Sequence, residues 1–175
     1  MLLNAYLSAA EIISKDLPQV SFSLIKASTL PKEFYAHFLK KHPRLKISLV
    51  EKDSYETIRS SDLAIVCSGT ATLECALLGT PMIICYKGTF LSYLIAKSLI
   101  QVPCLGLPNL ILGEKRMPEL LQYDATPKKI AETAIKILKD KDSRDSMRKD
   151  LEKVSEKLGE PGANRRAAEE VLKSL

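Results

Sequence analysis

Residues 63–86 read LAIVCSGTATLECALLGTPMIICY, and this stretch decides the fold. Two uninterrupted apolar runs, residues 63–67 and 82–86, have the length and composition of strands that are covered on both faces. Between them, residues 71–78 favour a helix, and Gly79 occupies the position at which helices commonly end. A strand, a helix and a second strand joined by short turns predict a right-handed βαβ unit with parallel strands.

The alternation continues on both sides of this unit. Upstream we expect the following elements: a helix over residues 1–16, a strand over 20–25, a helix over 31–41, a strand over 45–50 and a short helix over 54–60. Downstream we expect a helix over about 90–99, a Pro- and Leu-rich loop over 102–113, and polar helix from Pro127 onward with a break at 159–162. One feature is unusual, because a parallel sheet normally begins with a strand and this chain opens with a helix.

The fold class that these elements predict is α/β. We expect a Rossmann-like, mostly parallel sheet with helices on both faces over residues 1–126. Residues 127–175 are expected to form a helical C-terminal extension of the same domain.

Composition and charge exclude several classes of protein. With 175 residues, 46% of them apolar, the chain is typical of one soluble globular domain. No stretch approaches the roughly 20 apolar residues of a membrane span, and we expect no signal peptide. Because the basic residues after residue 127 are interleaved with acidic ones and Trp is absent, we expect no nucleic-acid binding. The net charge of +5 remains compatible with an anionic ligand or membrane surface.

The cysteines predict no metal chemistry. Cys67, Cys75, Cys85 and Cys104 form no C-x-x-C pair, and no histidine lies within ligand spacing. We therefore expect no metal site, no cofactor, and reduced thiols in a cytosolic core.

The loop after the first strand of the βαβ unit is the place to look for a ligand, because open parallel sheets bind ligands beyond the carboxyl ends of their strands. Gly69 lets a ligand approach the backbone. The hydroxyls of Ser68, Thr70 and Thr72 add donors beside a helix N-terminus, which suits a phosphate or diphosphate. Glu74, one helical turn later, could accept hydrogen bonds from two ribose hydroxyls. The alternative is a simple turn followed by a helix cap.

Two further polar residues are candidates. Asn109 is the only side chain of the loop over 102–113 with both amide donors and an acceptor, so it could recognise a base or a sugar, or else cap backbone in a buried connection. The same loop, if exposed, could contact an acyl chain or a membrane surface. Lys87 follows the second strand and could meet a phosphate, or be a solvated lysine. Neither His37 nor His42 has a partner that suggests a triad, and we assign no catalytic residue.

These segments carry a family resemblance. Residues 61–74 and 78–82 resemble the nucleotide-sugar signature of GT-B glycosyltransferases. Four more segments narrow the resemblance to the C-terminal domain of the lipid-A-disaccharide synthase family: YK at 86–87, LIAK at 94–97, LPNLI at 107–111 and PELLQ at 118–122.

The resemblance implies a glycosyltransferase of lipid A biosynthesis. The family condenses UDP-2,3-diacylglucosamine with 2,3-diacylglucosamine 1-phosphate (lipid X), an acylated sugar phosphate acceptor, to lipid A disaccharide 1-phosphate and UDP, without a metal. It acts in the cytoplasm, peripheral to the inner membrane of Gram-negative bacteria. The resemblance implies that residues 68–70 and Thr72 hold the diphosphate, Glu74 the ribose and Asn109 the nucleotide. For the basic helices after residue 127 we expect the other domain, a second copy in a homo-oligomer, or anionic lipid as partner.

The sequence also departs from the family pattern. The Gly-Ser-Arg motif expected after the first strand is absent, as is the N-terminal, acceptor-binding domain with the expected acid/base residues. Lys87 stands where the family usually has Arg, which keeps the charge but loses the planar fork. We therefore expect a donor-binding fragment that is inactive by itself. The alternatives are another GT-B UDP-sugar enzyme, such as a peptidoglycan UDP-GlcNAc transferase or an epimerase, and a non-catalytic α/β interaction module. The segment over 107–109 speaks against the other GT-B enzymes.

Overall fold

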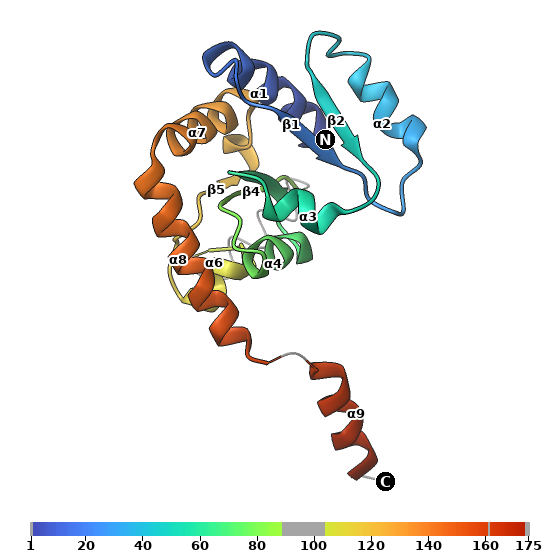
Figure 1. The fold of residues 1–175 in the computed structure, drawn as a ribbon, viewed down its shortest axis with the longest axis vertical. Coiled ribbons are helices and arrows are strands. Elements are labelled where there is room, and N and C mark those ends of the chain that lie inside the picture. Colours follow the sequence, from blue (N-terminus) through green and yellow to red (C-terminus); the bar gives the residue numbers. More distant parts are fainter. Residues whose placement is uncertain (1, 89–103, 161, 174–175) are drawn as a thin grey trace.

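A computed structural model describes residues 2–88, 104–160 and 162–173, and its architecture is α/β (Figure 1). The elements in chain order are α1 Leu2–Asp16, β1 Phe22–Ile25, α2 Lys32–Leu39, β2 Ile47–Val50, α3 Ser54–Arg59, β3 Ala64–Cys67, α4 Thr70–Leu77, β4 Met82–Tyr86, α6 Leu107–Leu112, β5 Glu119–Leu121, the 3-10 turn η1 Gln122–Asp124, α7 Pro127–Lys139, α8 Lys141–Leu158 and α9 Ala163–Lys173.

The βαβ unit predicted from residues 63–86 is confirmed. Strands β3 and β4 run parallel, with Cys67 opposite Cys85, and α4 connects them. Helix α4 ends before Gly79, whose φ of +70° is the left-handed conformation that glycine adopts without strain. Strand β5 pairs in parallel with the other side of β4, with Tyr86 opposite Leu121.

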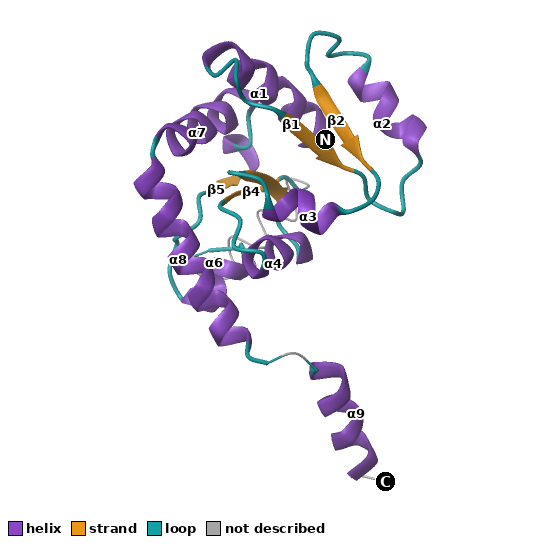
Figure 2. Cartoon of the chain, in the orientation of Figure 1, coloured by secondary structure: helices purple, strands orange, loops and turns teal. Residues whose placement is uncertain are grey.

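The strands form two hydrogen-bonded sheets, where the sequence predicted one. Strands β1 and β2 make a parallel pair, and β3, β4 and β5 make a parallel sheet in the order β3-β4-β5 (Figure 2). Val20, Phe22 and Ile25 nevertheless pack against the same core as β3. Side-chain packing therefore joins the two sheets where a continuous ladder of hydrogen bonds was expected.

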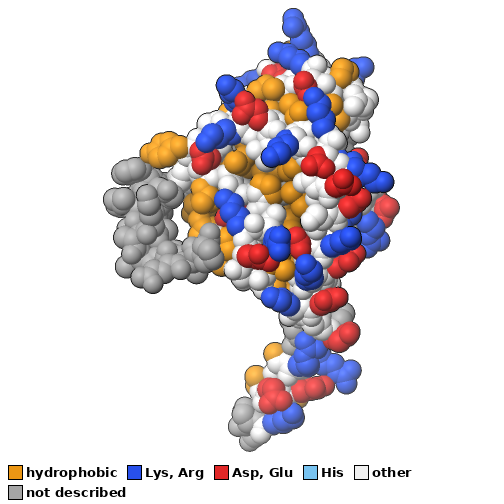
Figure 3. All heavy atoms as spheres, turned by 90° about the vertical axis from the view of Figure 1, so that its left-hand side faces the viewer, with side chains coloured by type: hydrophobic (Ala, Val, Ile, Leu, Met, Phe, Trp, Pro, Cys, Tyr) orange, Lys and Arg blue, Asp and Glu red, His pale blue; other side chains and the backbone are white. Residues whose placement is uncertain are grey.

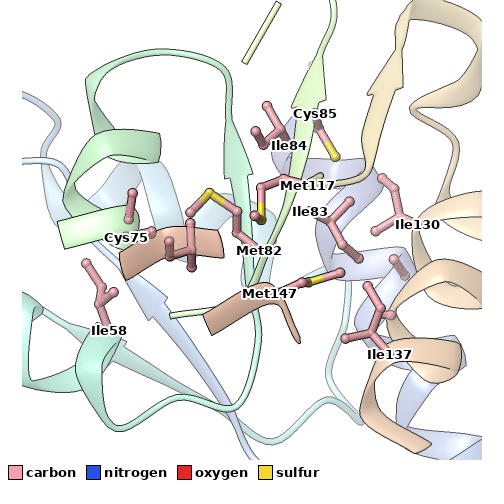
Figure 4. Packing of buried hydrophobic residues seen from close by; sticks show 14 of the residues in the cluster. Ile58, Cys75, Met82, Ile83, Ile84, Cys85, Met117, Ile130, Ile137 and Met147 are labelled. Atoms are coloured by element: carbon pink, nitrogen blue, oxygen red, sulfur yellow. The ribbon is translucent and has the colours of Figure 1, made fainter. Parts of the chain in front are cut away.

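The core surrounds β4, whose residues Met82, Ile83, Ile84 and Cys85 are fully buried (Figure 4). Helices α1 and α7 pack against each other, and α8 packs against α4 and α6. The two helices α7 and α8 contribute the following residues to the core: Ile130, Ala131, Ala134, Ile137, Met147, Leu151 and Val154. Residues 127–158 are thus part of the packed body, whereas α9 lies away from it (Figure 1).

Charged residues of α7 and α8 are interleaved as the sequence predicted. Basic and acidic side chains alternate around a strip of apolar surface on the face shown in Figure 3. Three ion pairs at helical spacing bridge them: Lys128–Glu132, Arg148–Asp145 and Lys153–Asp150. The first two pairs face solvent, whereas Asp150 of the third is 7% exposed. The opposite face of each helix packs into the core.

The segment over residues 102–113 is the main correction to the predicted secondary structure. Its described part contains helix α6 where a loop was expected, because Pro108 lies in the first turn, which tolerates proline, and Gly113 (φ +80°) ends the helix. Strand β5 was not predicted, since it has three residues and begins with the acidic Glu119. The helix expected over 90–99, and the LIAK segment of the resemblance, lie outside the described residues.

Two further findings concern only the described residues. None of their helices is long and apolar enough to cross a membrane. They contain no group of three or more His, Cys, Asp or Glu side chains that could hold a metal ion.

Candidate functional site

The carboxyl ends of β3, β4 and β5 lie at one edge of the sheet, and the residues that follow them are candidates for ligand contacts. Ser68 follows β3, Lys87 follows β4 and Gln122 follows β5. The parallel register brings these three positions to the same edge. The site predicted from the first strand–helix turn therefore lies where a parallel sheet binds ligands.

Two hydrogen bonds from Ser68 fix the turn between β3 and α4. The Ser68 amide donates to the Cys85 carbonyl of the neighbouring strand at 2.9 Å, and Ser68 Oγ donates to the Leu105 carbonyl at 3.3 Å. Gly69 has a φ of +150°, which side chains rarely allow. A Cβ added to Gly69 would meet no atom within 4 Å, so open space borders the backbone here.

The first turn of α4 offers donors to a ligand, but not from every predicted residue. No side chain caps the helix, and Thr70 is exposed. Thr72, in contrast, is fully buried, and both its amide (3.0 Å) and its Oγ1 (2.6 Å) donate to the Gly69 carbonyl. Thr72 therefore shapes the turn, while the donors left toward solvent are Thr70 and the free amides of the first helical turn.

Glu74 and Lys87 are both exposed, Glu74 within α4 and Lys87 just beyond β4. Within the described part of the chain, neither side chain forms an ion pair. The Glu74 carboxylate adds to the effect of burial on the neighbouring thiol, and together they raise the pKa of Cys75 to about 11. Both charged groups are free to meet a ligand at the sheet edge.

Asn109 lies in the interior with all four of its hydrogen-bonding positions filled. Its Nδ2 donates to the Met117 carbonyl (2.8 Å) and to Glu119 Oε1 (2.7 Å), and its Oδ1 accepts from the amides of Arg116 (2.9 Å) and Met117 (2.7 Å). The alternative expected from the sequence, an asparagine that caps backbone in a buried connection, describes these contacts. In this structure the Asn109 side chain is bound to Glu119 and to backbone groups, and its contact with a nucleotide stays a prediction.

A phenol and two thiols lie close together where α1 meets β3 and β4. Tyr6 Oη of α1 lies 3.3 Å from Sγ of Cys67, which is opposite Cys85 in the sheet. Burial raises the pKa of Tyr6, and the neighbouring Cys85 raises it further. Burial likewise raises the pKa of Cys85 to about 12, so this thiol is protonated at neutral pH and is not a nucleophile.

The comparisons with known proteins decide the family. A family model described as lipid-A-disaccharide synthetase matches residues 1–173. The chain belongs to the lipid-A-disaccharide synthase family.

Relatives in this family are similar over nearly the whole chain. A lipid-A-disaccharide synthase of Syntrophus aciditrophicus is 41% identical over 167 residues, which are 95% of this chain and 44% of the relative. One from Anaeromyxobacter dehalogenans is 39% identical over 171 residues, which are 98% of this chain and 45% of the relative. The chain thus spans less than half the length of these lipid-A-disaccharide synthases.

A solved structure supports the fold class. A crystal structure described as a UDP-N-acetylglucosamine 2-epimerase from Listeria monocytogenes superposes with a TM-score of 0.57. The match covers 84% of this chain and 35% of the epimerase chain, at 14% identity. It shows that the α/β arrangement of this lipid-A-disaccharide synthase domain is shared by a more distant protein.

Two residues of the lipid-A-disaccharide synthase domain were missed as site candidates. Glu119 is 6% exposed, and it was quoted within PELLQ without being given a role, although an acidic residue beside an apolar pair requires partners if it is buried. Gln122, 8% exposed, has a φ of +49°, and its Nε2 has no hydrogen-bond partner among the described residues. No pattern in the sequence indicates a left-handed glutamine.

Proposed function

We propose that the chain is the donor-binding part of a lipid-A-disaccharide synthase, which transfers 2,3-diacylglucosamine from UDP to 2,3-diacylglucosamine 1-phosphate. The observation that carries this proposal is the turn over residues 68–70. It combines an uncapped helix N-terminus, a glycine bordered by open space and exposed Thr70 at the carboxyl edge of the sheet. Family membership over residues 1–173 supplies the reaction class.

The diphosphate is the group that this turn fits best. In the reaction, a hydroxyl of the acceptor loses its proton to a base and forms a bond to the anomeric carbon of the donor sugar, while the bond from that carbon to the diphosphate breaks. UDP leaves with the electron pair of the broken bond, so negative charge develops on its terminal phosphate. The amides and the positive dipole end of α4, together with the hydroxyl of Thr70, are suited to stabilise that charge without a metal ion.

The other roles follow from exposure. Glu74 is exposed one turn into α4 and is assigned to the ribose hydroxyls, and Lys87 is assigned to the diphosphate as a second source of positive charge. Ser68, Thr72 and Asn109 are assigned to hold the turn and its surroundings in place.

The acceptor, the acid/base residues and the membrane surface are assigned to the part of the relatives that this chain does not span. The acylated substrates place the reaction at the cytoplasmic face of the inner membrane of a Gram-negative bacterium.

Titration of the chain with UDP by calorimetry tests the proposal. We expect saturable binding that Glu74→Ala weakens at least tenfold, the effect of losing about 1.4 kcal/mol of hydrogen bonding. Glu152→Ala is the matched control, because Glu152 is an exposed glutamate on α8, and it should bind as the unmodified chain does. Absence of UDP binding to the folded chain, or full binding by Glu74→Ala, would contradict the assignment.

A further inference from the structure

We propose that Glu119 is a positioning residue of the nucleotide site: its buried carboxylate fixes the segment over residues 104–106, and through Leu105 it fixes the Ser68 turn. The inference rests on the proposed function only for the identity of the ligand. The structural coupling from Glu119 to Ser68 is a separate claim that can be measured without any ligand.

Three donors converge on the Glu119 carboxylate. The Leu105 amide donates to Oε2 at 2.9 Å, the Gly106 amide donates to Oε1 at 2.9 Å, and Asn109 Nδ2 donates to Oε1 at 2.7 Å. No cation pairs with this carboxylate in the part of the chain that the structure describes. Since charge-assisted hydrogen bonds are stronger than neutral ones, these three contacts are what holds a buried negative charge in place.

The chemistry requires a carboxylate here. All three partners are N–H donors, so the group between them must be an acceptor only. A glutamine of the same shape would direct its own NH2 at one of the donors. Glu119 therefore specifies the positions of Leu105 and Gly106 in a way that its amide analogue does not.

The close approach of Gly106 shows how tightly this segment is held. A Cβ built on Gly106 would lie 2.4 Å from Cδ1 of Ile84 and 2.9 Å from Glu119 Oε1. The backbone at Gly106 thus lies directly against β4 and β5, and the absence of a side chain lets its amide reach the carboxylate.

The link to the site runs through Leu105. Its amide binds Glu119 and its carbonyl accepts from Ser68 Oγ at 3.3 Å, so one residue connects β5 with the turn that follows β3. A displacement of Leu105 moves the hydrogen-bond partner of Ser68. The turn over residues 68–70 then loses a contact that orders it in the absence of ligand. Part of the binding free energy must then be used to order the turn, which weakens binding.

The first test uses Glu119→Gln without ligand. In ¹⁵N-edited spectra we expect the amide signals of Leu105 and Gly106 to shift, and those of Ser68 and Gly69 to shift with them. Thr80→Val is the matched control, because it removes a buried 2.8 Å hydrogen bond to the Ile58 carbonyl at the other end of β4. It should lower stability without moving the Ser68 signal. Unchanged Ser68 and Gly69 signals in Glu119→Gln would overturn the inference.

The second test measures UDP affinity at a temperature at which all variants are folded. We expect Glu119→Gln to bind UDP about fivefold to tenfold more weakly, the effect of about one hydrogen bond, and Thr80→Val to bind normally. Because Glu119 acts through Ser68, the double variant with Ser68→Ala should bind no more weakly than Ser68→Ala alone. Additive losses would overturn the pathway through Leu105. Absence of UDP binding by the unmodified chain would contradict the proposed function, and the ligand-free spectra would still decide the coupling.

Discussion

Asn109 and Glu119 are hydrogen-bonded to each other in the interior of the domain, with 2.7 Å between Nδ2 and Oε1. Each also binds backbone groups, so the pair joins α6, the segment before it and β5 into one unit. Asn109, which the sequence offered either as a ligand contact or as a cap for backbone, is therefore the partner of a carboxylate that was not singled out from the sequence.

Truncation of Asn109 is expected to cost stability before it costs binding. Asn109→Ala leaves two backbone amides, one carbonyl and part of the Glu119 carboxylate without their partner, and we expect the free energy of unfolding to fall by about 2–4 kcal/mol. Urea unfolding measures this, with the exposed Asn4→Ala of α1 as control. If Asn109→Ala lost UDP binding at unchanged stability, Asn109 would contact the nucleotide directly.

The half-buried phenol of Tyr6 predicts a loss of stability at high pH. Because burial raises the pKa of Tyr6, the folded chain keeps a proton that the unfolded chain releases above about pH 10. The unfolded state then binds fewer protons, and the free energy of unfolding falls as the pH rises. Tyr6→Phe removes this group. Above pH 10, the free energy of unfolding of Tyr6→Phe should therefore fall less steeply with pH than that of the unmodified chain, by up to about 1.4 kcal/mol per pH unit.

Urea unfolding between pH 9 and pH 11 measures the slope. Tyr55→Phe, an exposed tyrosine on α3, is the control and should behave as the unmodified chain does. Equal slopes for Tyr6→Phe and the unmodified chain would contradict the burial of this phenol.

The four thiols should differ in reactivity. Cys67 is exposed, whereas Cys75, Cys85 and Cys104 are buried, and burial raises the pKa of all three. An alkylating reagent at neutral pH should therefore modify one thiol rapidly in the folded chain and all four after denaturation. Mass spectrometry locates the modified residue, and Cys67→Ser should abolish the rapid phase. Rapid loss of a second thiol would be inconsistent with the packing around β4.

Gln122 offers a stabilising substitution. Its buried Nε2 has no hydrogen-bond partner in the part of the chain that the structure describes, and an unpaired buried donor costs about 1–3 kcal/mol. Gln122→Met keeps the length of the side chain and removes the donor, so we expect a higher melting temperature in calorimetry. The exposed Gln19→Met is the control and should leave the melting temperature unchanged. A lower melting temperature for Gln122→Met would mean that the amide contributes a contact to the folded state.

Most of the elements could be predicted from the sequence, because buried strands and helices require apolar residues in a recognisable pattern. The apolar runs over 63–67 and 82–86 predicted β3 and β4. The alternation of strand and helix patterns before them predicted β1 and the helices that follow it. Strand β5 was not predicted because three residues are too few to show an alternating pattern. Helix α6 was not predicted because Pro108 indicated a loop. These are elements whose existence depends on their neighbours more than on their own residues.

The candidate site was predicted unevenly for a similar reason. The turn over residues 68–70 is a local pattern, and its place at the sheet edge follows from the strand before it. The contact between Asn109 and Glu119 depends on how α6 returns to β5, and a spacing of ten residues does not reveal it. The left-handed conformation of Gln122 likewise has no signature in residue type.

The pairing of α1 with α7 has a consequence for how the chain is made. Helix α1 is synthesised before β4, whereas its packing partner α7 and the core residue Val154 are synthesised after β4. At a synthesis rate of about 5 to 20 residues per second, the apolar strand β4 is made several seconds before the helices α7 and α8 that bury it. During synthesis the apolar central strand is therefore exposed to solvent and needs protection from other chains. A ribosome that stalls before α8 releases a chain that is prone to aggregate.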